Sequence, residues 1–175
     1  IDNDGNIIPG SLDKGDFANF MGEIFDIWFS RDDSRISIRY FEQFLAVFFG
    51  NSPSLCKMNG TCQEYITIDY NGDVYSCDNF IGYPDLKFGN LSEKSLKEII
   101  NTNKVSGIKQ LLSQPHLECQ GCFAYRYCNG GCNKYRYIQA RNFSSPFYFC
   151  EDTRLLLRHV KEVIISEHPL LETVY

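Results

Sequence analysis

The stretch CQGCFAYRYCNGGC, from Cys119 to Cys132, holds four of the eight cysteines in a chain of 175 residues. A C-x2-C turn of this kind aims two sulfurs at one point, which is how proteins grip a metal ion or cluster. Gly130 and Gly131 allow the backbone to turn sharply just before Cys132. Eight thiolates divide into two sites of four sulfurs, and the remaining cysteines are Cys56, Cys62, Cys77 and Cys150.

Three chemistries compete for these thiols. Disulfides are compatible with the even cysteine count and with three Asn-x-Ser/Thr sequons, at Asn59, Asn90 and Asn142. They are the least favoured, because closely spaced C-x2-C thiols are more typical of metal or redox sites. The spacing alone leaves two structural zinc sites and two [4Fe–4S] clusters equally open.

The composition excludes two classes of partner. The formal net charge of -5 and the lack of a basic block argue against nucleic-acid binding. The longest apolar run, residues 44–49, is too short to span a bilayer, so we expect no membrane partner and a cytoplasmic location. The chain begins with Ile1 rather than methionine, which suggests a fragment.

The first fifty residues are predicted to form helix, strand and helix. Apolar residues recur at helical spacing from Phe17 to Trp28, with Asp16 as the expected N-cap and Trp28 in the core. Alternation over residues 36–40 predicts a short strand, and residues 41–49 predict a second helix. This order suits the end of an α/β domain.

The rest of the chain predicts a hairpin and further helices. Asn71-Gly72 between the β-prone runs 65–70 and 73–76 is a strong hairpin signal. Helices are expected from Ser92, as the cap, to residue 100, over 105–112, and after Cys150, with Glu151 and Asp152 in the favourable first turn.

The full cysteine pattern resembles a known family signature. Cys62-x9-Gly72-x4-Cys77, the Cys119–Cys132 stretch and Cys150 together resemble the seven-cysteine SPASM domain, a C-terminal extension of many radical S-adenosylmethionine enzymes. Further matches resemble the anaerobic sulfatase-maturating enzymes within that group: Cys56, Tyr75-Ser76-Cys77-Asp78, Phe88-Gly89-Asn90-Leu91 and Cys128-Asn129-Gly130-Gly131-Cys132. The resemblance covers about residues 52–159.

The resemblance implies an α+β fold, with a small hairpin, helices and irregular cysteine-rich loops around two cluster sites. Residues 1–50 would be the last helix-strand-helix of a partial α/β barrel, residues 51–165 the auxiliary-cluster domain and residues 166–175 a tail. Among possible cofactors, two [4Fe–4S] clusters are expected, with zinc as a substitute in aerobically prepared protein.

The resemblance also implies which thiols share a cluster. Cluster I would be held by Cys56, Cys62, Cys77 and Cys132, and cluster II by Cys119, Cys122, Cys128 and Cys150. Full ligation by cysteine leaves no open iron, which favours electron transfer over Lewis-acid chemistry. The expected partners are a sulfatase or another peptide substrate and an external electron donor or acceptor protein.

The implied reaction is oxidation of a cysteine or serine of a sulfatase to formylglycine. Asp78 matches the aspartate that serves as general base in this family. The radical-generating C-x3-C-x2-C motif is absent, because Tyr135 stands where its third cysteine is required. S-adenosylmethionine and a third cluster would then bind only a missing N-terminal barrel, and this chain alone would be inactive.

Two alternatives remain open from the sequence. One is a SPASM domain of another peptide maturase, forming thioether or carbon–carbon crosslinks. The other is a zinc-stapled structural or interaction module without enzymatic activity. Residues between the ligands, Tyr125, Arg126 and Tyr127, are expected to pack around a site, and His116, His159 and His168 are expected at the surface.

Overall fold

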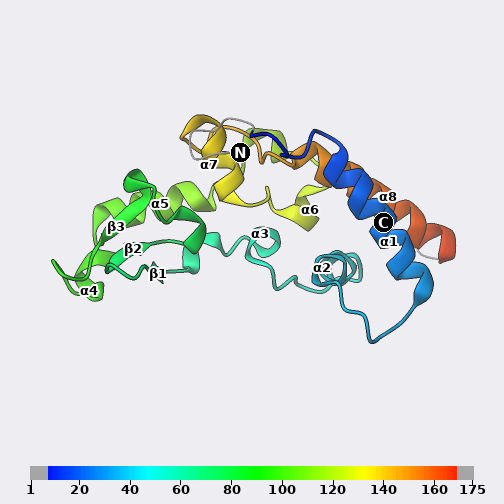
Figure 1. Ribbon diagram of the computed structural model, residues 1–175, viewed down its shortest axis with the longest axis horizontal. Coiled ribbons are helices and arrows are strands. Elements are labelled where there is room, and N and C mark those ends of the chain that lie inside the picture. The colour runs from blue at the N-terminus through cyan, green and yellow to red at the C-terminus, as the bar shows by residue number, and fades with distance from the viewer. Residues whose placement is uncertain (1–7, 169–175) are drawn as a thin grey trace.

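The computed structural model describes residues 8–168 as an elongated molecule with a helical end and a sheet end (Figure 1). The helical end contains α1 (Asp16–Arg31), α2 (Arg39–Phe48) and α8 (Cys150–Glu167). The sheet end contains β1 (Thr67–Ile68), β2 (Asp73–Tyr75), β3 (Lys87–Asn90), α4 (Leu96–Ile100) and α5 (Asn103–Ser113). Between them lie α3 (Cys56–Asn59), α6 (Tyr125–Cys128) and α7 (Asn133–Ala140). Short 3₁₀ turns complete the chain: η1 (Cys62–Glu64), η2 (Asp78–Phe80), η3 (Pro84–Leu86) and η4 (Leu117–Cys119).

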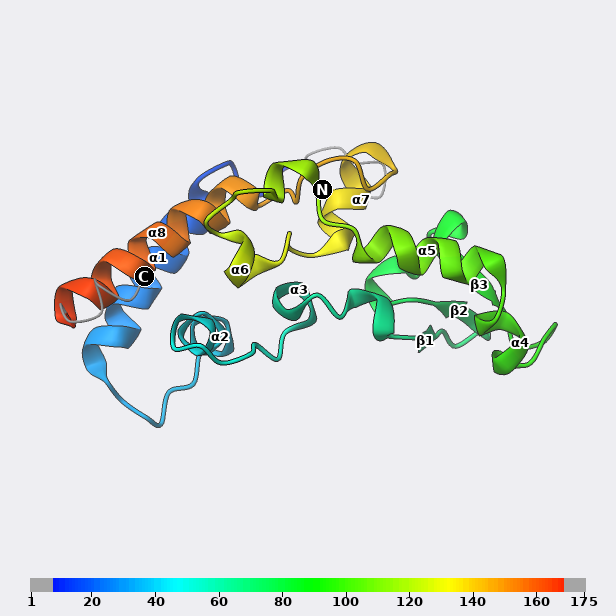
Figure 2. The same ribbon diagram turned by 180° about the vertical axis from the view of Figure 1, so that it is seen from behind.

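The helical end is held by one aromatic and aliphatic core. Helices α1 and α8 pack side by side, and α2 contacts α6 (Figures 1 and 2). Phe25, Phe41 and Ile164 are fully buried where these helices meet, each burial being worth about 1.5–3 kcal/mol. Trp28 is partly buried and packs against this core, as expected. Residues from both ends of the sequence therefore share one core, while the domain boundaries at 50 and 165 stay predictions.

Helix α1 begins differently from the sequence prediction. Its N-cap is Gly15, which has no side chain to cap the helix, and Asp16 is the first helical residue. The capping carboxylate comes from α8 instead: Asp152, only 2% exposed, accepts hydrogen bonds from the backbone N–H groups of Gly15 (3.0 Å) and Ala18 (3.1 Å). An anion at a helix N-terminus satisfies amides that the helix itself leaves open.

The strand predicted over residues 36–40 is wrong. Ile36 to Ile38 is irregular and Tyr40 already belongs to α2, because no other strand in residues 8–168 lies beside this segment. The Ile36 carbonyl accepts a hydrogen bond from the Trp28 indole N–H (2.8 Å) rather than from a neighbouring strand. The helix-strand-helix expected from a barrel is therefore helix, irregular link and helix.

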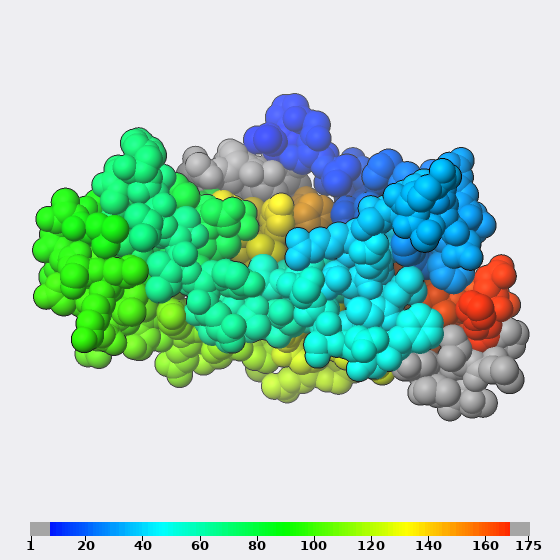
Figure 3. Space-filling model, turned by 90° about the horizontal axis from the view of Figure 1, so that it is seen from below, coloured from blue at the N-terminus to red at the C-terminus, as the bar shows by residue number. Residues whose placement is uncertain are grey.

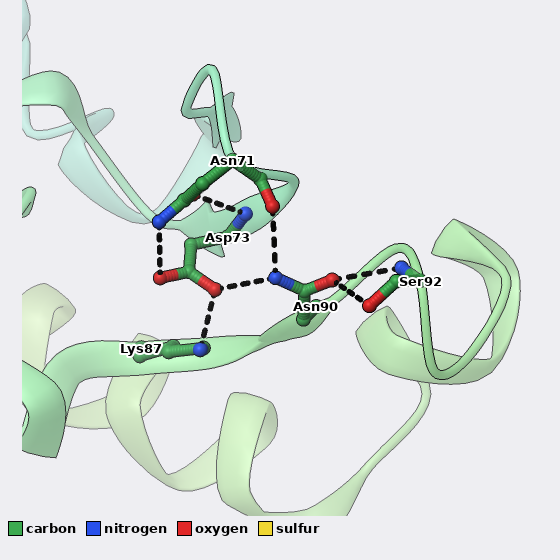
Figure 4. Close-up of polar contacts among 5 residues, drawn as sticks. All are labelled: Asn71, Asp73, Lys87, Asn90 and Ser92. Carbon is green, nitrogen blue, oxygen red and sulfur yellow. Dashed lines mark hydrogen bonds and ion pairs between the residues drawn. The ribbon is translucent and has the colours of Figure 1, made fainter.

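The sheet end confirms the hairpin and adds a strand. β1 and β2 pair antiparallel across Asn71-Gly72, with Thr67 opposite Tyr75, and β3 pairs with the other edge of β2. The Asp73 carboxylate joins these strands: it accepts from Asn90 (2.7 Å) and Asn71 (3.1 Å) and pairs with Lys87 (Figure 4). This polar network fixes β2, the strand that leads to Cys77.

The helices of the sheet end pack on its buried face and require one correction. Helix α4 does not begin at Ser92, which hydrogen-bonds Asn90 instead. It begins after Ser95, because the side chains of Ser95 and Glu98 form a reciprocal capping box. Ser92 has no Glu or Gln three residues later to form one. The predicted helices over 105–112 and after Cys150 are confirmed as α5 and α8. None of the helices within residues 8–168 is long and apolar enough to cross a membrane.

Candidate metal centre

Most of the eight cysteines lie in or beside short helical elements, whereas Cys77 follows β2 at the sheet end and Cys150 begins α8 at the helical end. All eight are free thiols and partly buried, so no disulfide forms among them. The segment around α3, cyan in Figure 3, crosses one face between the sheet end and the helical end. Helix α3, which begins with Cys56, contacts α6, which ends with Cys128, and η1, which begins with Cys62, contacts α5. Cysteines from distant parts of the sequence therefore lie on neighbouring elements. In the view from behind, α3 and α6 lie opposite each other (Figure 2).

One pocket brings together all four thiols predicted for cluster II. It is lined by Cys119, Cys122, Cys128 and Cys150, together with Tyr125 and Arg154. The C-x2-C turn closes locally, with the Cys122 N–H donating to the Cys119 carbonyl (3.3 Å). Cys128 ends α6 and Cys150 begins α8, so two helix termini position the other two sulfurs. We call these four residues the second thiol group.

The glycine pair beside this pocket leads the chain away from it. Gly131 has a φ of 75°, and a Cβ added there would lie 2.4 Å from the Phe147 ring. Only glycine combines this left-handed backbone with so close an approach. The chain then places Cys132 just before α7, outside the pocket of the second thiol group. The assignment of Cys132 to a different cluster from its three neighbours stays a prediction.

Three of the four thiols predicted for cluster I also come together. Cys56 and Cys62 line one pocket with Gly131 and Arg136. Asn133, the neighbour of Cys132 in the sequence, lines the same pocket, and burial followed by the charges of Cys132 and Cys56 raises the pKa of Cys62. We call Cys56, Cys62, Cys77 and Cys132 the first thiol group.

Cys77 is the member that the structure does not join to its group. Its thiol donates to the Asp78 carboxylate (3.0 Å) and accepts from the Asn79 amide (3.7 Å). Burial and this Asp78 contact raise the pKa of Cys77 to about 12, and the Cys77 contact lowers the pKa of Asp78. Asp78 itself is exposed.

The chemistry of these thiols fits a cationic metal centre. Burial, followed by repulsion from Cys150, Cys119 and Cys122, raises the pKa of Cys128 to about 11. Burial also raises the pKa of Cys119 and Cys150, and buried thiols close to one another deprotonate together only when a metal supplies compensating positive charge. Lys57 and Arg154 provide part of it, since their charges lie near Cys132 and Cys150 respectively. The donor set therefore fits a thiolate-bound metal or cluster.

The arrangement of side chains needed to hold a single metal ion is a requirement separate from the chemistry of the thiols. Within residues 8–168, no three or more His, Cys, Asp or Glu side chains are arranged to hold one metal ion. The histidines contribute nothing to the thiol pockets: His159 pairs with Asp26 on the helical end (2.7 Å), and His116 accepts from the Glu118 N–H. Of the aromatic residues between the ligands, Tyr125 lines both thiol pockets and so packs around the site as expected.

Sequence reasoning missed three cations beside the thiols, one of which, Arg154, lines the pocket of the second thiol group. Lys57 lies over the Tyr40 ring (4.2 Å) and Arg136 is buried near Cys62 and Cys119. Their positions in the sequence, directly after or close to a cysteine, were the one sign that they lie beside the thiols. A buried arginine and an exposed one look alike in a sequence, so the signal was not decisive.

A fold with two thiol-lined pockets is typical of a protein that binds metal ions or clusters. Residues 56–123 match the SPASM family, described as an iron-sulfur cluster-binding domain. The chain therefore carries a SPASM domain, and its similar proteins are sulfatase-maturating enzymes. A cysteine-type anaerobic sulfatase-maturating enzyme from Clostridium novyi (strain NT) is 32% identical over 145 residues, 82% of this chain and 38% of that protein. A serine-type enzyme from Bacteroides thetaiotaomicron is 30% identical over 160 residues, 90% of this chain and 38% of that protein.

Solved structures agree with the sequence comparison. Histidine-tagged anSMEcpe with bound AdoMet superimposes with a TM-score of 0.79 and 27% identity, over 100% of this chain and 46% of that one. Native anSMEcpe with bound AdoMet and Kp18Cys peptide gives 0.77 and 29%, over 95% and 47%. The α+β arrangement of helices and a small antiparallel sheet is thus that of these enzymes. The chain spans 38% of the length of the curated relatives described above.

Proposed function

We propose that this chain is the auxiliary-cluster domain of a sulfatase-maturating radical enzyme and that each thiol group holds one [4Fe–4S] cluster. The observation that carries the proposal is the single pocket lined by Cys119, Cys122, Cys128 and Cys150. Its membership is the ligand set that the resemblance implies for cluster II. The similarity to both cysteine-type and serine-type enzymes supports the same assignment.

Iron–sulfur clusters fit this arrangement better than zinc. Four thiolates on one zinc ion, with Zn–S near 2.3 Å, lie about 3.8 Å from each other. The match of residues 56–123 to a family described as an iron-sulfur cluster-binding domain favours clusters over zinc for these thiols. A cubane cluster takes one thiolate at each corner iron and so spreads the same four sulfurs over a larger volume.

The chain's role in the reaction would be electron transfer and proton removal. A bound cluster of this type accepts and releases single electrons. With four cysteines for each cluster, no iron is left open, and the sulfurs hold the clusters rather than bind substrate. The substrate would be a cysteine or serine of a sulfatase peptide, converted to formylglycine, with an external redox protein taking the electron away.

Asp78 would be the general base. It is exposed, and its carboxylate accepts a hydrogen bond from the Cys77 S–H group. Ligation of Cys77 as a thiolate removes that donor and leaves the Asp78 carboxylate available to accept a substrate proton. The full-length enzyme with Asp78→Asn should keep its iron but lose formylglycine formation about 10²-fold or more. An unchanged rate would exclude Asp78 as the base.

The first test is the metal and sulfide content of the anaerobically prepared chain, with its visible absorption. Two clusters predict about eight iron and eight sulfide per chain. About two zinc and no sulfide, even after reconstitution with iron and sulfide, would establish the zinc-stapled module instead.

The chain alone should not complete the reaction. Its cysteines are all assigned to the two thiol groups, so S-adenosylmethionine and a third cluster would bind residues outside it. Incubation of the 175-residue chain with S-adenosylmethionine and a sulfatase peptide should give no formylglycine. A peptide crosslink formed by the full-length enzyme would favour the alternative of another peptide maturase. A cytoplasmic location stays a prediction.

A further inference from the structure

Arg136, on α7, is a buried cation in the pocket that contains Cys56 and Cys62. Its side chain is 4% exposed. The guanidinium donates to the carbonyls of Gln114 (2.8 Å) and Ser145 (3.3 Å), to the Phe143 carbonyl and to the Asn133 side-chain oxygen (3.1 Å). It therefore occupies one fixed position, unlike a surface arginine.

The acceptors around Arg136 are all neutral. Three are backbone carbonyls and one is an amide oxygen, and no carboxylate within residues 8–168 pairs with the guanidinium. A buried charge without a counter-charge is costly, and proteins keep one only where something compensates it. Tying loops together does not require a net charge. The burial of this cation therefore points to an anionic neighbour.

The nearest candidates for that neighbour are the thiolate groups. Arg136 lines the pocket that contains Cys56 and Cys62. Burial lowers the pKa of Arg136, whereas the charges of Cys119 and Cys62 raise it. Cys62 belongs to the first thiol group and Cys119 to the second, so the charge of Arg136 acts on one thiol of each group.

Lys57 is a further cation near the thiols, and its charge sits at the end of a flexible side chain. Its charge is felt by Cys132, Cys56 and Cys128, and its ammonium lies over the Tyr40 ring (4.2 Å). An ammonium on a flexible stem is readily moved or deprotonated, whereas a guanidinium stays charged and directed. Arg136 is therefore the fixed charge of the pair.

We propose that Arg136 is a positioning residue that compensates charge at both cluster sites and makes both clusters easier to reduce. The inference rests on the proposed function, because it requires iron–sulfur clusters in the two thiol groups. A cluster held by four thiolates becomes more negative when it is reduced. A nearby fixed cation stabilises that reduced form more than the oxidised one.

The test compares three variants of the reconstituted 175-residue chain. Arg136→Gln removes the charge, Arg136→Lys keeps it but loses the forked hydrogen bonds, and Arg35→Gln is the control on an exposed arginine. Each is measured for iron content, thermal unfolding and reduction midpoints by potentiometric titration followed by electron paramagnetic resonance. In Arg136→Gln, the ratio of reduced to oxidised cluster at a fixed potential should fall about tenfold, which is about 59 mV for one electron.

The outcomes separate charge from structure. Arg136→Lys should unfold at a lower temperature while keeping midpoints near those of the unmodified chain, and Arg35→Gln should change neither. Unchanged midpoints in Arg136→Gln, or the same shift in Arg136→Lys as in Arg136→Gln, would overturn the inference. If Arg136→Gln fails to fold, Arg136→His provides the readout: its midpoints should rise as pH falls through about 6.5, where imidazole gains charge, and pH-independent midpoints would overturn the proposal.

The same measurements distinguish failure of the proposed function from failure of the role proposed for Arg136. An unmodified chain that binds zinc without sulfide has no midpoint to measure, and both proposals then fall. An unmodified chain with about eight iron and an Arg136→Gln variant with the same midpoints would remove only the role of Arg136.

Discussion

The two thiol groups are assembled in different ways. The second group comes from residues 119–128 plus the first residue of α8, and all four of its thiols line one pocket. The first group is drawn from α3, η1, the end of the β2 segment and the start of α7, and Cys77 remains with its own neighbours Asp78 and Asn79. The thiols of the second group therefore line one common pocket, whereas Cys77 lies outside the pocket that contains Cys56 and Cys62.

This difference assigns the two clusters different structural roles. A ligand that joins groups not already joined contributes its binding energy to folding. A cluster bound by the first thiol group would connect the sheet end, through Cys77, to α3 and α7. We therefore expect the first cluster to tie the two ends together and the second to occupy a site already built.

The largest effect is expected from removing one thiol of each group. Cys122→Ala should lose about four iron and keep about four, because only the second site is broken. Cys62→Ala should likewise lose about four iron, but should also loosen the sheet end. Iron analysis and hydrogen exchange of β2 and α5 check this. Equal exchange in the two variants would contradict the contrast between the groups.

The turn between the groups gives the next largest effect. Gly131→Ala should destabilise the chain by about 3 kcal/mol, because the new Cβ meets the Phe147 ring on a left-handed backbone. Gly121→Ala is the matched control: its φ is 73°, but nothing lies within 4 Å of its added Cβ. It should cost only about 1 kcal/mol. Denaturant unfolding of both variants measures the difference, and equal losses would mean that the close approach to Phe147 is unimportant.

The contact between α1 and α8 supports the second group, because α8 begins with Cys150. Asp152→Ala should lower the free energy of unfolding by about 2 kcal/mol, since the Gly15 and Ala18 N–H groups lose their acceptor. Glu151→Ala, on the exposed side of the same turn, should change it by less than about 0.5 kcal/mol. Thermal unfolding followed by circular dichroism compares the two, and similar values would argue against the cap.

The smallest effect concerns the sheet end and is seen only in acid. The Lys87 contact, then Asn90, holds the pKa of Asp73 below its usual value. A depressed pKa adds stability above the unfolded value of about 3.9, and this stability is lost as pH falls through the folded pKa. Hydrogen exchange of β2 and β3 in the cluster-free chain should rise below about pH 4, but not further in Asp73→Asn. Parallel acid profiles for the two proteins would contradict this role.

Local patterns in the sequence predicted much of the fold. The Asn71-Gly72 turn predicted the hairpin, and apolar spacing predicted α1, α5 and α8 because those helices bury one face. β3 was not foreseen, because four residues containing Gly89 carry no β-prone pattern. Gly89 is required by packing instead, as a Cβ there would lie 3.1 Å from Ile99.

The site was predictable as far as spacing determines it. The cysteine spacings predicted the second group, which one segment largely forms. The cap by Asp152 and the burial of Arg136 depend on residues more than twenty positions away, Gly15 and Gln114 among them. No local pattern encodes such contacts, and the strand predicted over residues 36–40 failed for the same reason, because strands require a partner.

The Asp152 cap limits how the cluster-binding part can be cut out for separate study. A version beginning at residue 51 keeps α8 but discards Gly15 and Ala18, so the buried Asp152 carboxylate loses both of its donors two residues from Cys150. Such a truncation would loosen the helix that supplies a cluster ligand. For expression of the isolated domain, the practical N-terminal limit is therefore set by α1, ahead of Gly15, rather than by the first cysteine.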